Sequence, residues 1–138
     1  LNHTILRLIE QFGSTIHLLT DPTRGGVATV LKEIAQSSEI GIDLIQSDFP
    51  MDEQVASACE LLGLDPLYVA NEGLFIAFVA KSKAEAVLAA LQEDENGQNA
   101  RIIGSVVAEH PKQVIMESAI GGKRVISMLP GEQLPRIC

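Results

Sequence analysis

The apolar residues of this chain switch repeatedly between two spacings, and this switching constrains the fold more than any other feature. Near the amino terminus, Ile5, Leu8, Ile9 and Phe12 recur at the period of a helix, and residues 16–20 then form a short apolar run typical of a strand. The same change of spacing continues along the chain. It predicts further helices over residues 27–34, 55–62 and 84–91, and further strands over 40–44, 74–79, 102–107, 114–116 and 125–129.

The order of these elements predicts an α+β fold. The continuous apolar segment 74–79 suits a strand that is covered on both faces. Gly121-Gly122, between the last two strands, predicts a hairpin. Helix–strand units followed by a hairpin indicate a mixed, largely antiparallel β-sheet packed with α-helices.

The length of 138 residues is in the range of one domain, and we expect that domain to cover residues 1–128. The last ten residues, 129–138, contain two prolines and a glycine that oppose helix formation, so we predict an extended, flexible tail. The sequence starts with Leu1 rather than Met, and we expect it to begin at a domain boundary.

Charge and composition exclude several classes of function. Asp and Glu number 18 against 10 Lys and Arg, for a net charge of −8, and no basic cluster is present to neutralise nucleic acid phosphates. No apolar stretch approaches the roughly 20 residues of a membrane-spanning helix, and the first residues lack a secretory pattern. We therefore expect a cytoplasmic protein that binds neither nucleic acid nor membrane. Two cysteines are too few for a disulfide framework, which fits a reducing compartment.

The two cysteines have different surroundings. Cys59 shares one side of a predicted helix with Val55 and Leu62, so it is interpreted as a small buried hydrophobe. Cys138 ends the predicted tail, a position from which a thiol is able to reach more than one site. On this feature alone, a functional end and a sequence that simply stops here both remain open.

The segment Asp21-Pro-Thr-Arg-Gly-Gly26 lies between a predicted strand and a predicted helix. Asp21 is expected to cap that helix and Pro22 to occupy its first turn. The paired glycines also permit close approach of a ligand or another chain, and N–H groups at a helix start favour anions. Arg24 adds a charge suited to phosphate or carboxylate. The residues alone leave two interpretations open: capping and packing, or an anion or domain-interface site.

The segment Asn71-Glu72-Gly73 comes directly before the most apolar part of the chain. A carboxylate at the mouth of a strand is placed for general-base catalysis, because partial burial of a carboxylate makes it a stronger base. Gly73 again permits close approach. A glutamate that caps a loop beside a glycine turn is the alternative. The three histidines are scattered, without Cys or carboxylate at ligand spacing, so no metal site is expected.

Three segments taken together resemble one protein family. They are Asp-Pro-Thr-Arg-Gly-Gly-Val-Ala over 21–28, Val-Ala-Asn-Glu-Gly-Leu over 69–74, and the ending Pro-Arg-Ile-Cys over 135–138. Over its whole length and in the same order, the chain resembles the carboxy-terminal domain of the HypE hydrogenase maturation proteins, in the AIR synthase-related superfamily. The first segment is typical of the superfamily, and the ending is the segment that selects HypE within it.

The resemblance implies an ATP-dependent carbamoyl dehydratase that serves metallocentre assembly. In that family, a HypF-type carbamoyltransferase loads a carbamoyl group onto the terminal cysteine, here Cys138. ATP then activates the thiocarbamate oxygen, and loss of phosphate leaves a thiocyanate, whose cyanide passes to iron on a HypC–HypD complex. The resemblance makes Cys138 the carrier and Glu72 the matching catalytic base. The resemblance also implies that six residues lie in the cleft between domains, near the nucleotide phosphates: Asp21, Thr23, Arg24, Gly25, Gly26 and Asn71.

The resemblance also implies that part of the machinery lies elsewhere. The family's amino-terminal domain carries most ligands of ATP and magnesium and the main homodimer interface, and this sequence does not include it. We therefore expect the isolated chain to bind no cofactor and not to hydrolyse ATP unaided. Two alternatives stay open: a non-catalytic carrier or interaction domain that presents Cys138, and another ATP-dependent synthetase of the superfamily, against which a terminal cysteine argues.

Overall fold

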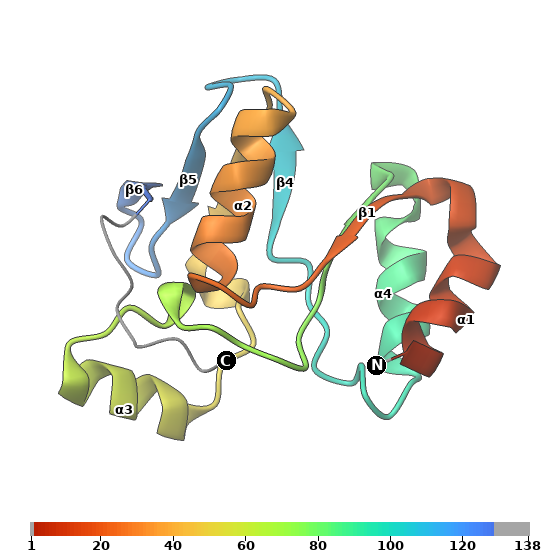
Figure 1. Cartoon of the computed structure of the whole chain (residues 1–138), viewed down its shortest axis with the longest axis horizontal. Helices are drawn as coiled ribbons and strands as arrows, with labels where there is room; N and C mark the ends of the chain where they lie inside the picture. Colours follow the sequence, from red (N-terminus) through yellow and green to blue (C-terminus); the bar gives the residue numbers. More distant parts are fainter. Residues whose placement is uncertain (1, 129–138) are drawn as a thin grey trace. The chain divides into compact units, whose positions relative to one another are not determined.

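The computed structural model describes residues 2–128, which form two compact units (Figure 1). Unit 1 consists of the described residues up to Asp21 together with Gly73–Ile102, and unit 2 consists of Pro22–Glu72 together with the described residues from Ile103 onward. The predicted tail, including Cys138, lies outside the described residues. The domain boundaries inferred from the sequence therefore stay a prediction, and each unit is described by itself.

Unit 1 combines an antiparallel strand pair with two helices. Its elements are α1 (Asn2–Phe12), η1 (Gly13–Thr15), β1 (Ile16–Thr20), β3 (Ile76–Val79), η4 (Lys81–Lys83) and α4 (Ala84–Gln92). β1 pairs with β3 from Ile16 opposite Val79 to Thr20 opposite Ile76. The core of this unit is built on three buried side chains, with half-buried neighbours around them: Leu8, Val87 and Leu91, surrounded by Phe12, Ile16, Leu19, Phe75, Val79 and Ala100.

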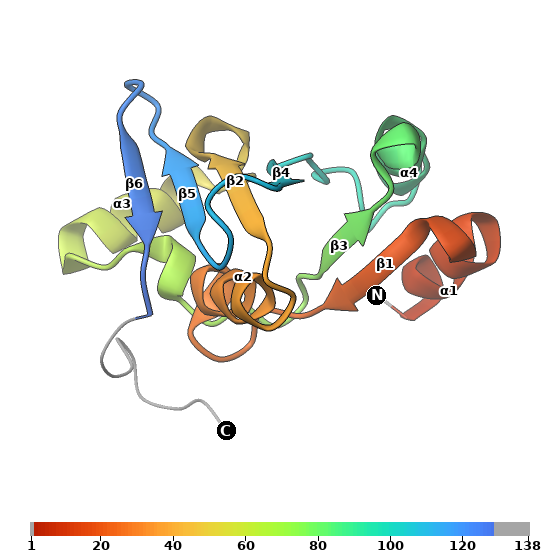
Figure 2. The same ribbon diagram turned by 90° about the horizontal axis from the view of Figure 1, so that it is seen from above.

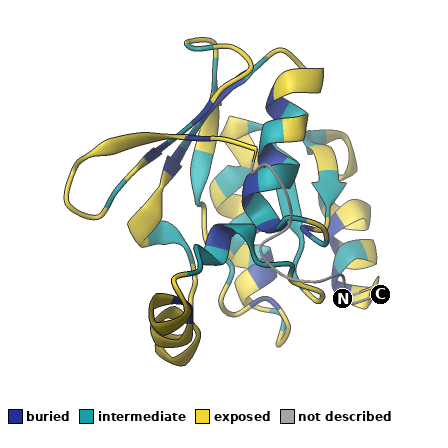
Figure 3. Ribbon diagram, turned by 60° about the vertical axis from the view of Figure 1, so that its left-hand side comes forward, coloured by how far each residue is buried: buried dark blue, intermediate teal, exposed yellow. Residues whose placement is uncertain are grey.

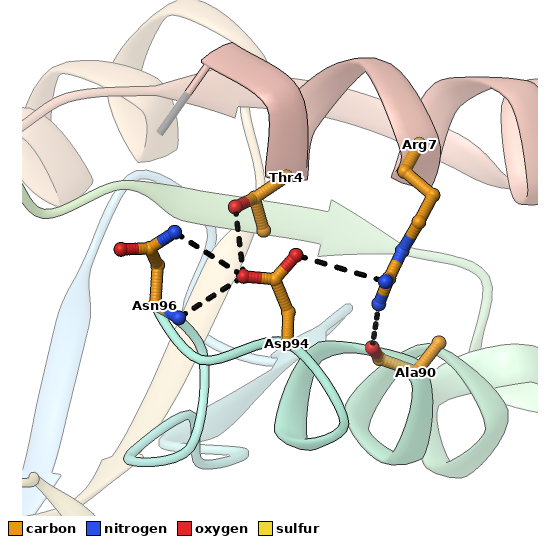
Figure 4. Close-up of polar contacts among 5 residues, drawn as sticks. All are labelled: Thr4, Arg7, Ala90, Asp94 and Asn96. Atoms are coloured by element: carbon orange, nitrogen blue, oxygen red, sulfur yellow. Dashed lines mark hydrogen bonds and ion pairs between the residues drawn. The ribbon is translucent and has the colours of Figure 1, made fainter.

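A cluster of polar contacts ties α1 to the turn that follows α4 (Figure 4). Asp94 Oδ1 accepts hydrogen bonds from the Thr4 hydroxyl at 3.1 Å and from the Asn96 backbone N–H at 3.0 Å. Arg7 Nη1 lies 3.8 Å from Asp94 Oδ2, and Arg7 Nη2 donates to the Ala90 carbonyl at 2.9 Å. The Asn96 backbone N–H, the Thr4 hydroxyl and the Arg7 charge together hold the pKa of Asp94 below its usual value.

Unit 2 is a four-stranded sheet with α2 packed on one face (Figure 2). Its elements are α2 (Gly26–Ser37), β2 (Gly41–Ile45), η2 (Gln46–Asp48), α3 (Glu53–Leu62), η3 (Pro66–Tyr68), β4 (Gly104–Val107), β5 (Val114–Glu117) and β6 (Lys123–Ile126). The strand order is β4-β2-β5-β6; β2 is antiparallel to β4 and parallel to β5, and β5 is antiparallel to β6. The buried apolar residues that the sheet contributes to the core are Ile42, Leu44, Val114, Met116 and Ile126.

The α+β class and the mixed, largely antiparallel pairing are confirmed, since among the described strands three of the four pairings are antiparallel. The hairpin at Gly121-Gly122 is also confirmed: Gly121 has a φ of 86°, and the Ser118 N–H donates to the Gly122 carbonyl at 2.7 Å. The expectation of a single sheet is wrong, because β1 and β3 form a separate pair. Apolar spacing records which face of a strand is buried and carries no information about which strand lies beside it.

The apolar segment 74–79 also differs from its prediction. Only Ile76–Val79 forms a strand, and its residues are half-buried rather than fully covered. The reason is that β3 has β1 as its neighbour in a sheet of two strands, which leaves more of each strand accessible than in a wide sheet.

Candidate functional site

The first chemistry-bearing segment leads into α2 in a different way from the one the sequence predicts. α2 begins at Gly26, and its N-cap is Gly25 in the left-handed conformation with a φ of 67°. Asp21 therefore does not cap the helix and Pro22 is not in its first turn, so both predictions are wrong. A glycine adopts a positive φ without steric cost, and this places the helix start after the glycine pair. Pro22 is fully buried instead.

The glycine pair is explained by close packing within the chain. A Cβ atom on Gly26 would lie 2.4 Å from the carbonyl oxygen of Leu67 and 2.7 Å from that of Val69. A Cβ atom on Gly25 would lie 2.3 Å from the hydroxyl oxygen of Thr29. The start of α2 thus sits directly on the backbone of η3, where no side chain fits. This supports the packing interpretation of the pair, and the anion site stays a prediction.

The same packing brings the two chemistry-bearing segments together within unit 2. The Asn71 backbone N–H donates a hydrogen bond to the Pro22 carbonyl at 3.2 Å. Asn71 and Glu72 consequently lie beside the segment that leads into α2. Among the described residues no side chain caps the amino terminus of α2. The backbone around Asn71 and Glu72 and the segment that leads into α2 are therefore neighbours, although they are far apart in the sequence.

A set of residues that the sequence analysis did not single out holds η3 in place. Asp65 Oδ1 accepts from the Leu67 N–H at 3.0 Å, and Asp65 Oδ2 forms an ion pair with Arg124 Nη2 at 2.8 Å. The Tyr68 hydroxyl donates to the Ser127 carbonyl at 2.8 Å. These contacts fix η3 to β6 and the residue that follows it. The signal that would have found Asp65 is an aspartate directly before a proline, typical of a helical start.

The predicted site residues differ in exposure. Asp21, Arg24, Asn71 and Glu72 are exposed, and Thr23 is half-buried. The partial burial that the sequence led us to expect for Glu72 is therefore not found, because Glu72 lies where the chain passes from unit 2 into unit 1.

Gly73 and Asp21 differ from the other residues of these two segments in conformation and in the unit to which they belong. Gly73 has a φ of 94°, and a Cβ atom added to it would have no atom of the described chain within 4 Å, so its backbone conformation is what favours glycine here. Close approach of a ligand to Gly73 stays a prediction. Asp21 belongs to unit 1, whereas the other described site residues belong to unit 2. The structure thus brings together the unit 2 residues of the predicted site: Thr23, Arg24, Gly25, Gly26, Asn71 and Glu72.

Two further features involve none of these residues. His110 Nε2 is 2.8 Å from Asp43 Oδ1, and His110 Nδ1 is buried without a hydrogen-bond partner among the described atoms. In unit 1, a shallow and mostly apolar hollow of about 360 Å³ is lined by Ile9, Gly13, Ile16, His17, Leu18 and Leu19. It contains none of the predicted site residues. Over residues 2–128, no group of three or more His, Cys, Asp or Glu side chains could hold a metal ion.

The arrangement in unit 2 is suited to acid–base chemistry on an anionic substrate. Exposed Glu72 offers a proton acceptor, Arg24 offers a positive charge, and the first N–H groups of α2 favour phosphate.

No helix in the described part of the chain is long and apolar enough to cross a bilayer.

Comparison with known proteins gives one family and a consistent set of relatives. The family described as AIR synthase related protein, C-terminal domain, matches residues 2–117. A carbamoyl dehydratase HypE of Bradyrhizobium diazoefficiens is 49% identical over all 138 residues, which make up 40% of that relative. The corresponding protein of Escherichia coli is 42% identical over 123 residues, which are 89% of this chain and 36% of that protein.

Solved structures agree with these relatives. A crystal structure of the hydrogenase maturation protein HypE in complex with ATP has a TM-score of 0.91 and 47% identity, and the match covers all of this chain and 42% of that one. A HypE–HypF complex has a TM-score of 0.86 and 39% identity, covering 93% of this chain and 41% of that one. The chain thus spans about two fifths of the proteins that it matches.

Proposed function

Since the chain belongs to the family of AIR synthase related proteins, C-terminal domain, we propose that it is the carboxy-terminal part of a carbamoyl dehydratase of the HypE type, used in [NiFe]-hydrogenase maturation. The observation that carries the proposal is the 49% identity over all 138 residues with a relative that bears this enzyme name. The share of 40% of that relative supports an activity that belongs to a longer protein than this chain.

The reaction proposed for Cys138 conserves the carbon, nitrogen and sulfur atoms of the carried group. The thiolate first accepts a carbamoyl group, which forms an S–C bond and gives a thiocarbamate. ATP then phosphorylates the carbonyl oxygen, with release of ADP. Removal of both protons from the nitrogen and departure of phosphate with the oxygen convert the C–N single bond into the triple bond of a thiocyanate. Transfer of the cyanide to iron on the acceptor complex then breaks the S–C bond, and two electrons supplied by that complex return Cys138 as a thiolate.

In this reaction Glu72 is the proposed base. It stands beside the segment that leads into α2, because Asn71 is hydrogen-bonded to the Pro22 carbonyl. We propose that Asp21, Thr23, Arg24, Gly25, Gly26 and Asn71 line the phosphate side of the cleft. The N–H groups at the start of α2 and the charge of Arg24 support this role, since both attract phosphate oxygens.

The proposal includes substrates and partners. A relative crystallised with ATP and another in complex with HypF support ATP as substrate and a HypF-type carbamoyltransferase as partner. We further propose a HypC–HypD complex as the acceptor of cyanide, a homodimer for the full-length protein, and the cytoplasm as its location, where a carrier thiol stays reduced. We also propose that magnesium accompanies the ATP and is held mostly by the amino-terminal domain of the full-length protein, since residues 2–128 contain no cluster of three or more His, Cys, Asp or Glu side chains suited to a metal ion.

One observation favours a second candidate, a carrier domain that presents Cys138 without taking part in dehydration. Glu72 is exposed, so the partly buried surroundings expected of a catalytic base are not found for it. In this case another residue of the full-length protein would remove the protons.

Substitution of Glu72 distinguishes the two candidates. The full-length protein with Glu72→Gln is incubated with the carbamoyltransferase, carbamoyl donor and ATP, and the carboxy-terminal peptide is analysed by mass spectrometry. A dehydratase base predicts that the peptide stalls with the carbamoyl mass of about 43 Da, whereas a carrier proceeds to thiocyanate at about 25 Da. Glu93→Gln, an exposed glutamate of unit 1 that is not among the predicted site residues, is the matched control. Cys138→Ala must abolish both masses, and modification that persists contradicts the tail mechanism.

A further inference from the structure

The one-turn helix η3 depends on neighbouring elements for its position. It covers only Pro66–Tyr68, and a 3₁₀ turn makes few hydrogen bonds, of poorer geometry than those of an α-helix. The helix α3, which leads into η3, is exposed at every residue except Cys59 (Figure 3). α3 thus offers few buried side chains that could hold η3, so other parts of unit 2 have to do so.

Two elements of unit 2 supply these contacts. The backbone of α2 packs on the backbone of η3 at Gly26, where a Cβ atom would not fit. The edge strand β6 and the residue after it provide two side-chain contacts: Asp65 Oδ2 is 2.8 Å from Arg124 Nη2, and the Tyr68 hydroxyl donates to the Ser127 carbonyl at 2.8 Å. We call Asp65, Tyr68, Arg124 and Ser127 the η3 junction.

The position of Glu72 follows from this junction. The backbone N–H groups of residues 67–69 are hydrogen-bonded within η3 and its N-cap, and the Asn71 N–H donates to the Pro22 carbonyl at 3.2 Å. The four residues from Tyr68 to Glu72 span at most about 14 Å. A displacement of η3 is therefore passed on to the backbone of Glu72.

The same junction lies near the start of the segment that ends in Cys138. Ser127, which accepts the hydrogen bond of Tyr68, is eleven residues before Cys138 in the sequence. Eleven residues span at most about 40 Å, which exceeds the length of chain from Tyr68 to Glu72 by more than a tyrosine side chain. Chain length therefore allows Cys138 to reach Glu72 from this junction while unit 2 keeps its structure.

The two steps of the proposed reaction make different demands on this geometry. Loading of the thiol takes place at the carbamoyltransferase, and Glu72 has no part in it. Dehydration requires Glu72 to meet the carried group, and a shift of about 1 Å in a reacting group is able to lower a rate on the order of 100-fold. Contacts that fix the base relative to the carrier segment should therefore affect dehydration and leave loading unchanged.

We propose that Tyr68 and Arg124 are positioning residues of the dehydration step. By holding η3 on β6, they fix Glu72 relative to the start of the segment that carries Cys138. The inference rests on the proposed function, in which Glu72 is the base and Cys138 the carrier.

The test uses variants of the full-length protein that remove one contact each. Tyr68→Phe removes the hydroxyl and keeps the ring, Arg124→Gln removes the charge, and the double variant removes both contacts with β6. Arg124→Lys keeps the charge and serves as the conservative variant. The matched control is Lys123→Gln, which removes the same charge at an exposed neighbour whose side chain is on the opposite face of β6.

Three measurements are made on each variant. Mass spectrometry of the carboxy-terminal peptide gives the rate of carbamoyl loading and then, after addition of ATP to the loaded protein, the single-turnover rate of thiocyanate formation. Hydrogen exchange follows the backbone N–H groups of residues 67–71. Circular dichroism checks that the variant is folded.

The inference predicts a selective effect. In the double variant, dehydration slows at least about tenfold, whereas loading stays within about twofold of wild type. The N–H groups of residues 67–71 exchange faster, because η3 has lost its contacts with β6. Arg124→Lys and Lys123→Gln stay within about twofold of wild type in both steps.

Two results overturn the inference alone. If the double variant forms thiocyanate at the wild-type rate, α2 is sufficient to hold η3. If loading and dehydration slow by the same factor, the junction has a purely structural role. A different result points to the proposed function: if the wild type forms no thiocyanate, or if Glu72→Gln forms it at the wild-type rate, the proposed role of Glu72 fails and the inference fails with it.

Discussion

The helices α2 and α3 of unit 2 are of similar length and are predicted from the same kind of apolar spacing, yet they have opposite relations to the core. α2 buries Gly26, Ala28, Leu31 and Ala35, and it packs on the sheet and on η3. α3 buries Cys59 and leaves Leu61 and Leu62 largely exposed. Helical spacing therefore predicts that a helix has an apolar side, but it does not predict whether another element covers that side.

Truncation of one leucine on each helix gives the largest expected contrast. Leu31→Ala removes a side chain that is 2% exposed, and it should lower the free energy of unfolding by about 3 kcal/mol through lost burial and a cavity. Leu62→Ala, at 71% exposure, should change that free energy by less than about 0.5 kcal/mol. Urea denaturation of the chain measures both. Equal losses for the two variants would mean that α3 is part of the core after all.

Two glycines extend the comparison to the helix ends. Gly26 at the start of α2 and Gly63 at the end of α3 have nearly the same φ, 65° and 66°, but a Cβ meets backbone oxygen at Gly26 and open space at Gly63. Gly63→Ala should therefore cost about 1 kcal/mol, the strain of the left-handed conformation alone. Gly26→Ala should cost about 2 kcal/mol or more, since the clash with η3 is added. Denaturation curves with similar midpoints would show that η3 moves away easily.

The smallest expected effect concerns α1, which is held partly by polar contacts. The pKa of Asp94 is below its usual 3.8, so its contribution to stability is present above that pH and is lost as the pH falls through the lowered value. Asp94→Asn should therefore lower the melting temperature near pH 6 and leave it closer to wild type near pH 3. The shift should be small, because the exposed Arg7 contributes a long and screened ion pair.

Calorimetric scans at the two pH values measure this effect, with the exposed Glu95→Gln as control. A loss of melting temperature that is equal at both pH values would show that the shape of the Asp94 side chain, and not its charge, holds α1.

The candidate site was partly predictable. The two segments around Asp21 and Glu72 were visible in the sequence, because glycines next to charged residues at the ends of apolar runs suit a turn or cap and also allow a ligand to approach the backbone. Their contact through Asn71 and Pro22 was not visible, since nothing local records a hydrogen bond between residues so far apart. The sequence also predicts the wrong start for α2, because contacts with a distant segment decide where this helix begins. Asp21 and Pro22 are good starting residues, but packing of the glycine pair on η3 determined where the helix begins.

Local sequence patterns predict most of the helices and strands, the final hairpin and the α+β class, because the period of the apolar residues and the turn-forming glycines act over a few neighbours. They also carry the resemblance that the family match bears out. Three features become visible in the folded chain alone: the strands divide into two sheets, Glu72 is exposed, and α2 is covered while most of α3 is not. These outcomes depend on contacts between distant residues, and burial of an apolar side chain stabilises a fold equally well whichever partner supplies the cover.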